Sequence, residues 1–296
     1  MLYGALRKVK LALEMIKFEH SVFALPFALT AALLAIREGR LGLGAALGKL
    51  AWIVVAMVGA RSAAMTFNRI VDAPCDARNP RTAARHLPAG LLSRRFGWGL
   101  LLASSLLFFA AAHALNPLCF RLAPVALALL LSYSFTKRFT SLTHFVLGIC
   151  LGAAPPAAWI AVQGSLDARI LWLTAAVTLW TAGFDIIYAC QDCEFDRREG
   201  LHSLPSRLGI AGALAVARVC HLLMPLCLLA LAAAFDLGWL SLAGVAVIAA
   251  LLVYEHRLVK PHDLSRVDAA FFTINGYVSV LFLLFWAADM LARGLT

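Results

Sequence analysis

Charged side chains are scarce in this sequence, and their scarcity excludes an ordinary water-soluble domain. Only 14% of the 296 residues are Asp, Glu, Lys or Arg, whereas 62% are hydrophobic. The formal charge of +10 would suit a nucleic-acid partner, but the sequence lacks a basic soluble domain that could bind one. We therefore expect no nucleic-acid partner, and we attribute the basic excess to loops beside anionic lipid headgroups.

Disulfide, metal-binding and secretion signals are also weak. The seven cysteines lie mostly in apolar runs, where cysteine acts as a small hydrophobic residue, so we predict no disulfides. Cys190 and Cys193 form one CxxC motif, which without a second pair is weak evidence for a metal site. Charged residues recur from Arg7 to Glu19, so we do not expect the N-terminal segment to be a secretory signal peptide.

What the sequence does contain is a series of apolar runs of roughly 20 residues, the length that crosses a bilayer core. Nine spans are predicted, at residues 19–37, 43–67, 95–114, 117–135, 140–163, 168–190, 211–234, 237–256 and 268–291. The predicted fold class is therefore an all-α polytopic membrane protein with nine transmembrane helices. We expect a single domain over residues 1–296.

The basic residues are distributed unevenly between the two sides of the predicted spans. The N-terminus and the connections after the even-numbered spans, with the adjoining span ends, hold 18 Lys and Arg, whereas the opposite side holds six. By the positive-inside bias, the N-terminus and these connections face the cytoplasm, and the C-terminus lies outside. We expect an integral protein of a bacterial-type inner membrane, and nothing in the sequence indicates its oligomeric state.

The first polar motif follows the second predicted span and reads NRIVDAPCDARNPRTAARHLPAG, residues 68–90. Asn68, Asp72 and Asp76 are spaced four apart, which places them on one face of a helix. Oxygen ligands stacked in this way suit a hard cation such as Mg²⁺. Pro74 predicts that the helix kinks or ends near Asp72.

The second polar motif follows the sixth predicted span. Tyr188, Asp192 and Asp196 repeat the four-residue spacing 120 residues later, and Asp185 lies seven residues before Asp192 on the same helix face. This correspondence predicts two related halves, at about residues 1–138 and 139–296, although the apolar spans themselves share no obvious identity.

The two pairs of aspartates would repel one another if the fold brought them together, unless divalent cations bridged them. Such cations usually keep coordination positions for substrate phosphates. The alternative is that acids at the ends of spans simply solvate a loop. Two pairs in equivalent places on one side of the membrane favour the cation site.

Ionisable residues inside predicted spans are costly and usually face the interior of the bundle. Asp185 is either functional or a satisfied core acid, and we favour the functional role. Arg61, seven residues before Asn68, needs an anion, which is either a protein carboxylate or a substrate group.

Basic residues accompany the acidic motifs on the predicted cytoplasmic side. Lys137 and Arg138 end the fourth span within LSYSFTKRFTSLTH. Taken alone they are topology anchors, but together with Arg81 and Arg85 they could clamp a phosphate group. Lys17, at the entry to the first span, is a weaker candidate of the same kind.

Histidines and aromatic residues show no spacing that indicates a site. We interpret three histidines as core or interface residues: His113, His144 and His221. Three aromatic side chains could stabilise a carbocation through their π faces, although packing is their default role in a membrane bundle. These are Tyr133, Phe184 and Tyr188.

The combined motifs resemble those of the UbiA superfamily of intramembrane aromatic prenyltransferases. The resemblance rests on NxxxDxxxD followed by RTAxRxxPxG, on YSxTKR after the fourth span, and on a second DxxxD followed by SLPSRLG, and it covers essentially the whole chain. NRIVDxxxDARNPRTAxRxLPAG and DIIYACQDxEFD are most similar to the 4-hydroxybenzoate polyprenyltransferase branch, including relatives proposed for menaquinone synthesis through the futalosine route. Arg69 stands where many members have Asp, and His86 replaces a different polar residue of some members and bears on acceptor choice.

The resemblance implies a helical bundle around a central cavity, with the motif loops as a cytoplasmic cap. It implies that Mg²⁺ and the diphosphate are held by Asn68, Asp72, Asp76, Asp192 and Asp196. Residues assigned to the substrate diphosphate are Lys137, Arg138, Arg81 and Lys17, and residues assigned to the aromatic acceptor are Arg61 and Arg85. Residues assigned to catalysis are Asp72, Asp192, Asp185 and Tyr188.

The predicted function is Mg²⁺-dependent transfer of a polyprenyl group from polyprenyl diphosphate to a small aromatic acid. The acceptor resembles 4-hydroxybenzoate or dihydroxynaphthoate, and the product belongs to ubiquinone or menaquinone biosynthesis. One alternative keeps the superfamily and changes the acceptor to haem, a chlorophyll precursor or another lipid. Another is a transporter, which would place polar residues near mid-membrane. The acids crowd one side of the membrane instead, which favours the enzyme.

Overall fold

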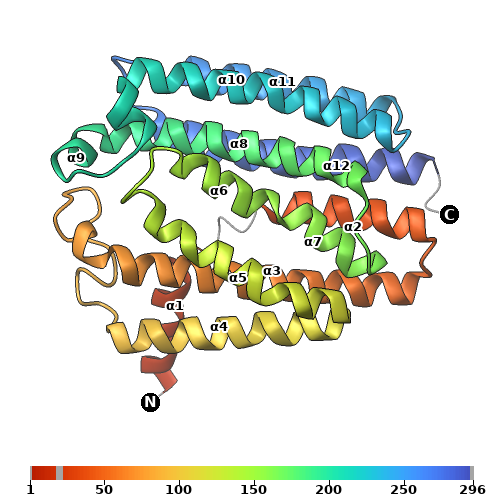
Figure 1. Ribbon diagram of the computed structural model, residues 1–296, viewed down its shortest axis with the longest axis horizontal. Coiled ribbons are helices and arrows are strands. Elements are labelled where there is room, and N and C mark those ends of the chain that lie inside the picture. The colour runs from red at the N-terminus through yellow and green to blue at the C-terminus, as the bar shows by residue number, and fades with distance from the viewer. Residues whose placement is uncertain (1, 18–22, 294–296) are drawn as a thin grey trace.

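The computed structural model describes residues 2–17 and 23–293, and these form a bundle of long helices. In chain order the elements are α1 (Leu2–Met15), α2 (Leu25–Gly39), α3 (Leu43–Asp76), α4 (Arg94–Leu115), α5 (Pro117–Thr136), α6 (Thr143–Gly152), α7 (Ala154–Gln163), η2 (Ala168–Ile170), α8 (Leu171–Ala189), η3 (Cys190–Asp192), α9 (Cys193–Arg198), α10 (Leu204–Ala234), α11 (Trp239–Leu258), η4 (Ala269–Ile274) and α12 (Asn275–Ala292). Figure 1 shows the long helices running side by side, with α1 lying across them.

Eight helical stretches of the described residues are long and apolar enough to cross a membrane. The all-helical membrane class is therefore confirmed, and the count of nine is not. The described part of α2 has 15 residues, which at 1.5 Å per residue span roughly 22 Å, less than a bilayer core of about 30 Å. The first residues of the predicted span 19–37 lie outside the described part of the chain.

The predicted span 140–163 corresponds to one membrane-spanning stretch, Thr143–Gln163, within which Pro155 and Pro156 restart the chain as α7 directly after α6 ends. One predicted span begins at the wrong residue, for an identifiable reason. The predicted span 211–234 begins earlier, at Leu204, because Ser203 caps α10 through its side chain. Gly209, with φ of +72°, interrupts the helical conformation between these two starting points.

The largest buried side chains pack between α2, α8 and α12. The ring of Phe27 lies 4.7 Å from the ring of Phe282 and 4.9 Å from that of Trp180, measured between centroids, and all three are fully buried. In contrast, only 22% of the most apolar stretch of α4, and 11% of that of α5, is buried inside the bundle. These two helices therefore present most of their apolar side chains to lipid.

Helices α6 and α8 approach closely because two glycines of α6 face α8. Gly148 and Gly152 have the GxxxG spacing, and a Cβ atom on either one would collide with Thr178. Small residues at this spacing let transmembrane helices pack with their backbones near each other. This contact positions His144, near the start of α6, beside the acidic end of α8.

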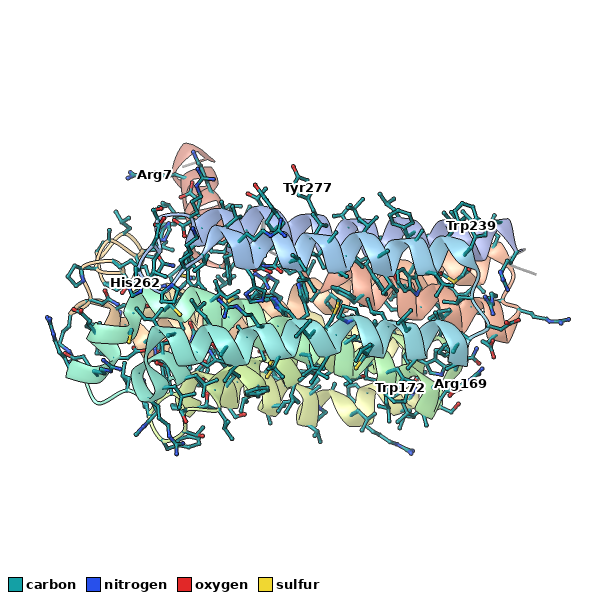
Figure 2. The ribbon with its side chains drawn as sticks, turned by 90° about the horizontal axis from the view of Figure 1, so that it is seen from above. Arg7, Arg169, Trp172, Trp239, His262 and Tyr277 are labelled. Carbon is teal, nitrogen blue, oxygen red and sulfur yellow. The ribbon has the colours of Figure 1, made fainter. Side chains whose placement is uncertain are left out.

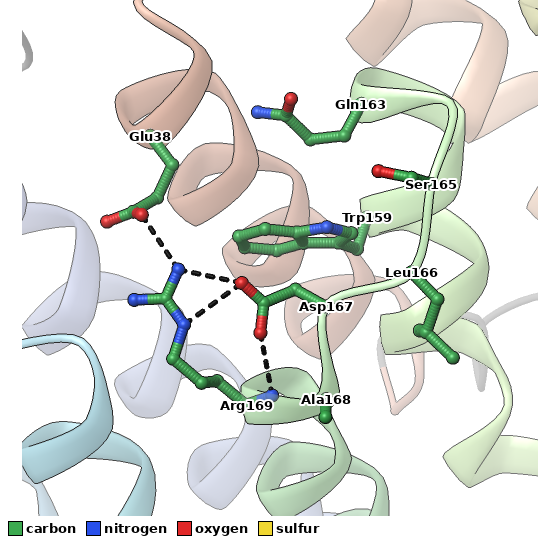
Figure 3. Close-up of a pocket in the computed structure, with 8 residues that line it drawn as sticks. All are labelled: Glu38, Trp159, Gln163, Ser165, Leu166, Asp167, Ala168 and Arg169. Atoms are coloured by element: carbon green, nitrogen blue, oxygen red, sulfur yellow. Dashed lines mark hydrogen bonds and ion pairs between the residues drawn. The ribbon is translucent and has the colours of Figure 1, made fainter.

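One end of the bundle holds a polar cavity of about 520 Å³ that takes no part in the predicted site. Figure 3 shows Arg169 donating hydrogen bonds to Asp167 and to Glu38, at 2.7 and 2.8 Å, beside the buried ring of Trp159. The hydrogen bonds from Arg169 hold the pKa of Asp167 below its ordinary value. This network joins the C-terminal turn of α2 to the connection between α7 and α8.

The two ends of the bundle differ in composition. Figure 2 places Arg169, Trp172 and Trp239 at one end and His262 at the other. Trp172 and Trp239 are exposed, as expected for tryptophans at a membrane interface. The connections that carry the two polar motifs lie at the same end of the bundle as His262, which is the left end in Figure 1.

Candidate active site

The two polar motifs meet at one end of the bundle, although they are about 120 residues apart in the sequence. Arg78, just after α3, forms an ion pair of 2.6 Å with Glu199, just after α9. The backbone N–H of His202 donates to the carbonyl oxygen of Lys137 at 2.7 Å. These contacts bring the ends of α3, α5 and α9 together.

Asp72 is the most enclosed acid of the first motif, with an exposure of 4%. Its Oδ2 atom accepts hydrogen bonds from Lys137 Nζ at 2.7 Å and from Asn68 Nδ2 at 3.1 Å. Its buried Oδ1 atom has no hydrogen-bond partner among the residues that the structure describes, and Arg138 Nη2 lies 3.6 Å away. Arg138 itself donates to the carbonyl oxygen of Val71 at 3.1 Å.

Of the two alternatives for Pro74, an end of the helix at Asp72 is wrong, because α3 continues to Asp76, and a kink near Asp72 stays a prediction. Pro74 lacks one backbone N–H group, so one hydrogen bond of the helix is missing. Because Pro74 lies in the last turn of α3, few helical hydrogen bonds follow it. The Thr82 hydroxyl donates to the carbonyl oxygen of Asp76 at 3.1 Å and supplies a donor at the helix end. Asp72 and Asp76 therefore stay on the same helix.

Asp76 is paired with an arginine that the sequence assigns to a different role. Arg85 Nη1 donates to both carboxylate oxygens of Asp76, at 2.8 and 2.9 Å. We assigned Arg85 to the aromatic acceptor, whereas in this structure its guanidinium group neutralises Asp76. The pair closes the loop after α3 back onto the helix end.

Asp192 joins the two motifs directly. Its carboxylate accepts from Arg81 through Nε, at 2.9 Å, and through Nη2, and Arg81 Nη1 donates to the Tyr188 hydroxyl at 3.1 Å. Burial lowers the pKa of Arg81, but its hydrogen bonds and charge contacts with Asp192 and Tyr188 raise it above its ordinary value. Arg81 therefore stays charged.

Asn79 is a buried residue of the site that the spacing of the motifs does not predict. Its Nδ2 atom donates to Asp192 at 3.0 Å, and its Oδ1 atom accepts from the backbone N–H of Arg81 at 3.0 Å. Asn79 thus holds both partners of the Arg81–Asp192 pair. The only sequence signal is its position between the acids and arginines of the motif.

Asp196 has a different environment from the other three acids. Its Oδ2 atom accepts a hydrogen bond from the Ser203 hydroxyl at 2.8 Å, and Ser203 caps the N-terminus of α10. The carboxylate therefore lies at the connection between α9 and α10.

Asp185 is paired with His144, which the sequence interprets as a core or interface residue and which is buried. His144 Nδ1 lies 2.7 Å from Asp185 Oδ2, and His144 Nε2 accepts the backbone N–H of Leu204 at 3.3 Å. Because Nε2 is an acceptor, Nδ1 carries the proton and donates to Asp185. The partners are 41 residues apart, so no sequence spacing indicates the pair.

Arg61 and Lys17 lie near each other. Arg61 Nη2 donates to the carbonyl oxygen of Lys17 at 3.3 Å, and Lys17 follows α1 with φ of +51°. Residues 18–22, which follow directly, lie outside the described part of the chain. The roles that we assigned to Arg61 and Lys17 stay predictions.

Three of the four acids pair with basic side chains, which the spacing of the motifs does not predict. The sequence predicts that divalent cations bridge the clustered carboxylates, whereas Lys137, Arg85 and Arg81 pair with Asp72, Asp76 and Asp192 here. Within the described ranges, no three His, Cys, Asp or Glu side chains are grouped to hold a metal ion, the CxxC cysteines included. The seven cysteines are free, as predicted.

The fold and this site define a helical membrane protein with an acidic and basic cluster at one end of its bundle. The model of the UbiA prenyltransferase family matches residues 24–288, and the chain belongs to this family. It is therefore an enzyme of the prenyltransferase class. Membership of this family favours an enzyme over the alternative of a transporter.

Proteins named 4-hydroxybenzoate octaprenyltransferase are similar to this chain over most of its length. The protein of Vibrio atlanticus (strain LGP32) is 30% identical over 238 residues, which cover 79% of this chain and 83% of that protein. The protein of Aeromonas hydrophila subsp. hydrophila is 33% identical over 234 residues, covering 77% and 79%. These relatives support the 4-hydroxybenzoate polyprenyltransferase branch of the family.

Solved structures share the fold. The apo structure of a UbiA homolog from Aeropyrum pernix K1 is 36% identical, with a TM-score of 0.81, and covers 92% of this chain and 98% of that chain. A UbiA homolog from Archaeoglobus fulgidus bound to DMAPP and Mg²⁺ is 19% identical, with a TM-score of 0.68, and covers 94% and 98%. The second likeness concerns the fold alone.

Replacing Asn79 tests the junction of the two motifs. We expect Asn79→Ala to lower prenyl transfer about tenfold, because Arg81 and Asp192 each lose one contact that holds them. Asn79→Asp, which has the same size, should lower transfer further, because a second carboxylate then faces Asp192. Initial rates in membranes with equal enzyme content measure both effects. Equal rates for wild type and Asn79→Asp would contradict the role of Asn79.

Proposed function

We propose that this enzyme transfers a polyprenyl group from polyprenyl diphosphate to a small aromatic acid, with Mg²⁺ as cofactor. The observation that carries the proposal is the meeting of Asp72, Lys137, Arg81 and Asp192 at one end of a lipid-exposed bundle. A diphosphate needs cationic partners, and an isoprenoid tail needs an apolar surrounding. Both are adjacent in this arrangement.

The names of the relatives support the substrates. The sequence relatives are named for octaprenyl transfer to 4-hydroxybenzoate, and the fold relatives from Archaeoglobus fulgidus bind Mg²⁺ with DMAPP or with GPP. We therefore propose a 4-hydroxybenzoate-like acceptor, with a dihydroxynaphthoate-like acceptor as the second candidate, in ubiquinone or menaquinone biosynthesis.

The donor chemistry of the site suits a divalent cation, although the acids of the described ranges are not grouped around one position. Among the described residues Asp72 Oδ1 is a buried carboxylate oxygen without a hydrogen-bond partner, and the other proposed ligands are also oxygen donors, which Mg²⁺ prefers. The proposed ligands are Asn68, Asp72, Asp76, Asp192 and Asp196. When bound, Mg²⁺ would neutralise charge on the departing diphosphate.

The basic side chains have the proposed task of holding the diphosphate. Lys137, Arg138 and Arg81 change partner from the carboxylates to the phosphate oxygens, for which a guanidinium fork is well suited. The C–O bond to the allylic carbon then breaks, and its electron pair leaves with the diphosphate. A ring carbon of the acceptor supplies the electron pair of the new C–C bond, and loss of a proton from that carbon restores the aromatic ring.

Asp185, Tyr188, Arg61 and Arg85 complete the proposed site. Asp185 and Tyr188 lie in the last turns of α8, just before Asp192, and we place them within reach of a bound substrate. We propose that Arg61 and Arg85 face the acceptor carboxylate, for which Arg85 would have to leave Asp76. The motif loops form a cap on the cytoplasmic side of the inner membrane.

One assay tests the proposal. Membranes containing the enzyme receive Mg²⁺, labelled polyprenyl diphosphates of several lengths and a panel of hydroxybenzoate and naphthoate acceptors, with detection by mass. We expect one prenylated acid, and we expect EDTA to lower its formation at least about a hundredfold, because the diphosphate then leaves without its counter-ion. Added Mg²⁺ should restore the rate.

Two outcomes would contradict the proposal. Transfer only to a haem or chlorophyll precursor would keep the family and replace the acceptor. Full transfer in EDTA would remove the metal from the reaction.

A further inference from the structure

Helix α12 is preceded by a π-helical turn, η4, at Ala269–Ile274. Such turns are rare, and they occur frequently at functional sites. The wider turn shifts the backbone hydrogen-bond pattern, so its carbonyl groups need donors from elsewhere. The turn follows the connection at the motif end of the bundle.

The side chain of Asn275 supplies these donors. Its Nδ2 atom donates to the carbonyl oxygens of Ala270 and Phe271, at 3.1 and 3.2 Å, and to Glu255 Oε1 at 2.9 Å. Its Oδ1 atom accepts from Trp180 Nε1 at 2.6 Å. The indole N–H is only a donor, so this contact fixes the orientation of the amide. Asn275 is fully buried, and none of these contacts belongs to the acidic site.

The π-helical turn aims Phe271 at the acidic site. The Phe271 ring lies 4.2 Å from the Tyr188 ring, 5.2 Å from Phe184 and 5.9 Å from Phe23, measured between centroids. Tyr188 in turn accepts a hydrogen bond from Arg81, which bonds to Asp192. One aromatic ring therefore separates Phe271 from the residues proposed to hold the diphosphate.

We propose that Asn275 is a positioning residue that holds the π-helical turn, and that Phe271 thereby forms an aromatic wall along the allylic end of the prenyl chain. The inference rests on the proposed function. The wall consists of Phe23, Phe184, Tyr188 and Phe271. Its π faces stabilise positive charge at the allylic carbon, and its rings exclude water from that carbon.

The wall has a consequence that a purely structural role lacks. When the allylic C–O bond breaks, the carbon bonds either to the acceptor ring or to the oxygen of a water molecule, which then releases a proton and leaves prenyl alcohol. The share of consumed polyprenyl diphosphate recovered as prenyl alcohol therefore reports on water exclusion. Loss of folded enzyme lowers both products equally and leaves this share unchanged.

Purified full-length enzyme in nanodiscs, with Mg²⁺ and the acceptor found by the assay above, tests the inference. Phe271→Leu removes the ring and keeps an apolar side chain, Phe271→Tyr keeps the ring, and Asn275→Leu removes the amide. Tyr277→Leu is the matched control, because Tyr277 is an exposed aromatic residue of α12. We expect the prenyl alcohol share to rise about tenfold in Phe271→Leu and in Asn275→Leu, and to stay at the wild-type value in Phe271→Tyr and Tyr277→Leu.

The double variant Phe271→Leu/Asn275→Leu separates positioning from an independent effect. If Asn275 acts through Phe271, the alcohol share of the double variant equals that of Phe271→Leu alone. The inference would be overturned by an unchanged prenyl alcohol share in Phe271→Leu, or by a share in the double variant that multiplies the two single effects. In both cases prenyl transfer by the wild-type enzyme would still support the proposed function. A wild-type enzyme that releases no diphosphate from any polyprenyl diphosphate would overturn both.

Discussion

Asp192→Asn is expected to lower prenyl transfer by at least about a hundredfold, the scale on which removed electrostatic groups of an active site act. Asp192 accepts hydrogen bonds from Arg81 and Asn79 and is the point where the two motifs meet. The amide removes the negative charge and turns one acceptor into a donor that faces other donors. Initial rates of labelled product in membranes, at equal enzyme content, measure the effect.

Glu194→Gln is the matched control for this variant. Glu194 lies two residues further along the chain, but its side chain is 85% exposed and pairs with the exposed Arg198 at 3.5 Å. An exposed pair of this kind contributes little to stability, so we expect wild-type transfer. Wild-type rates in Asp192→Asn, or an equal loss in both variants, would remove Asp192 from the site.

Asp72→Asn is expected to have the second large effect, with transfer again lowered about a hundredfold or more. Its buried carboxylate pairs with Lys137, so the variant also leaves an ammonium group without its counter-charge. We therefore expect a lower midpoint of thermal unfolding in detergent as well. Asp236→Asn, the same change at a fully exposed side chain at the opposite end, should alter neither quantity.

A second substitution separates the stability effect of Asp72 from its part in the reaction. In Asp72→Asn/Lys137→Met the unpaired ammonium group is gone, so the unfolding midpoint should return toward wild type. Transfer should stay low, because both the proposed metal ligand and a proposed diphosphate partner are missing. Recovery of transfer together with the midpoint would show that Asp72 serves only the fold.

The acidic and basic residues that meet in the site were largely predictable from the sequence. Asn68, Asp72 and Asp76 share a helix face because four residues make about one turn, and this spacing does not depend on the rest of the fold. The distribution of Lys and Arg along the chain likewise groups the two motifs on one side of the membrane. Asn68, Asp72 and Asp76 stay on one helix despite Pro74, because a proline in the last turn removes only one hydrogen bond.

The pairing of these residues could not be predicted in the same way. Arg85 contacts Asp76 rather than lying free for an acceptor, and His144 donates to Asp185 from another helix. The first contact depends on how the loop after α3 folds back onto the helix end, and the second depends on where α6 crosses α8. For His144 the decisive feature is the close glycine-mediated contact of α6 with α8, which no residue spacing records.

Hydropathy, helical periodicity and motif spacing are local properties of the chain, so they suffice to identify a helical membrane protein of the UbiA type with two acidic motifs. Three features depend instead on tertiary contacts: the basic side chains that pair with Asp72, Asp76 and Asp192, the contact of Asn79 with both motifs, and the hydrogen bonds of Asn275 to the π-helical turn. The contact of Asn79 with Asp192, for example, joins residues 113 positions apart. The packing of helices selects such contacts, and chain order does not.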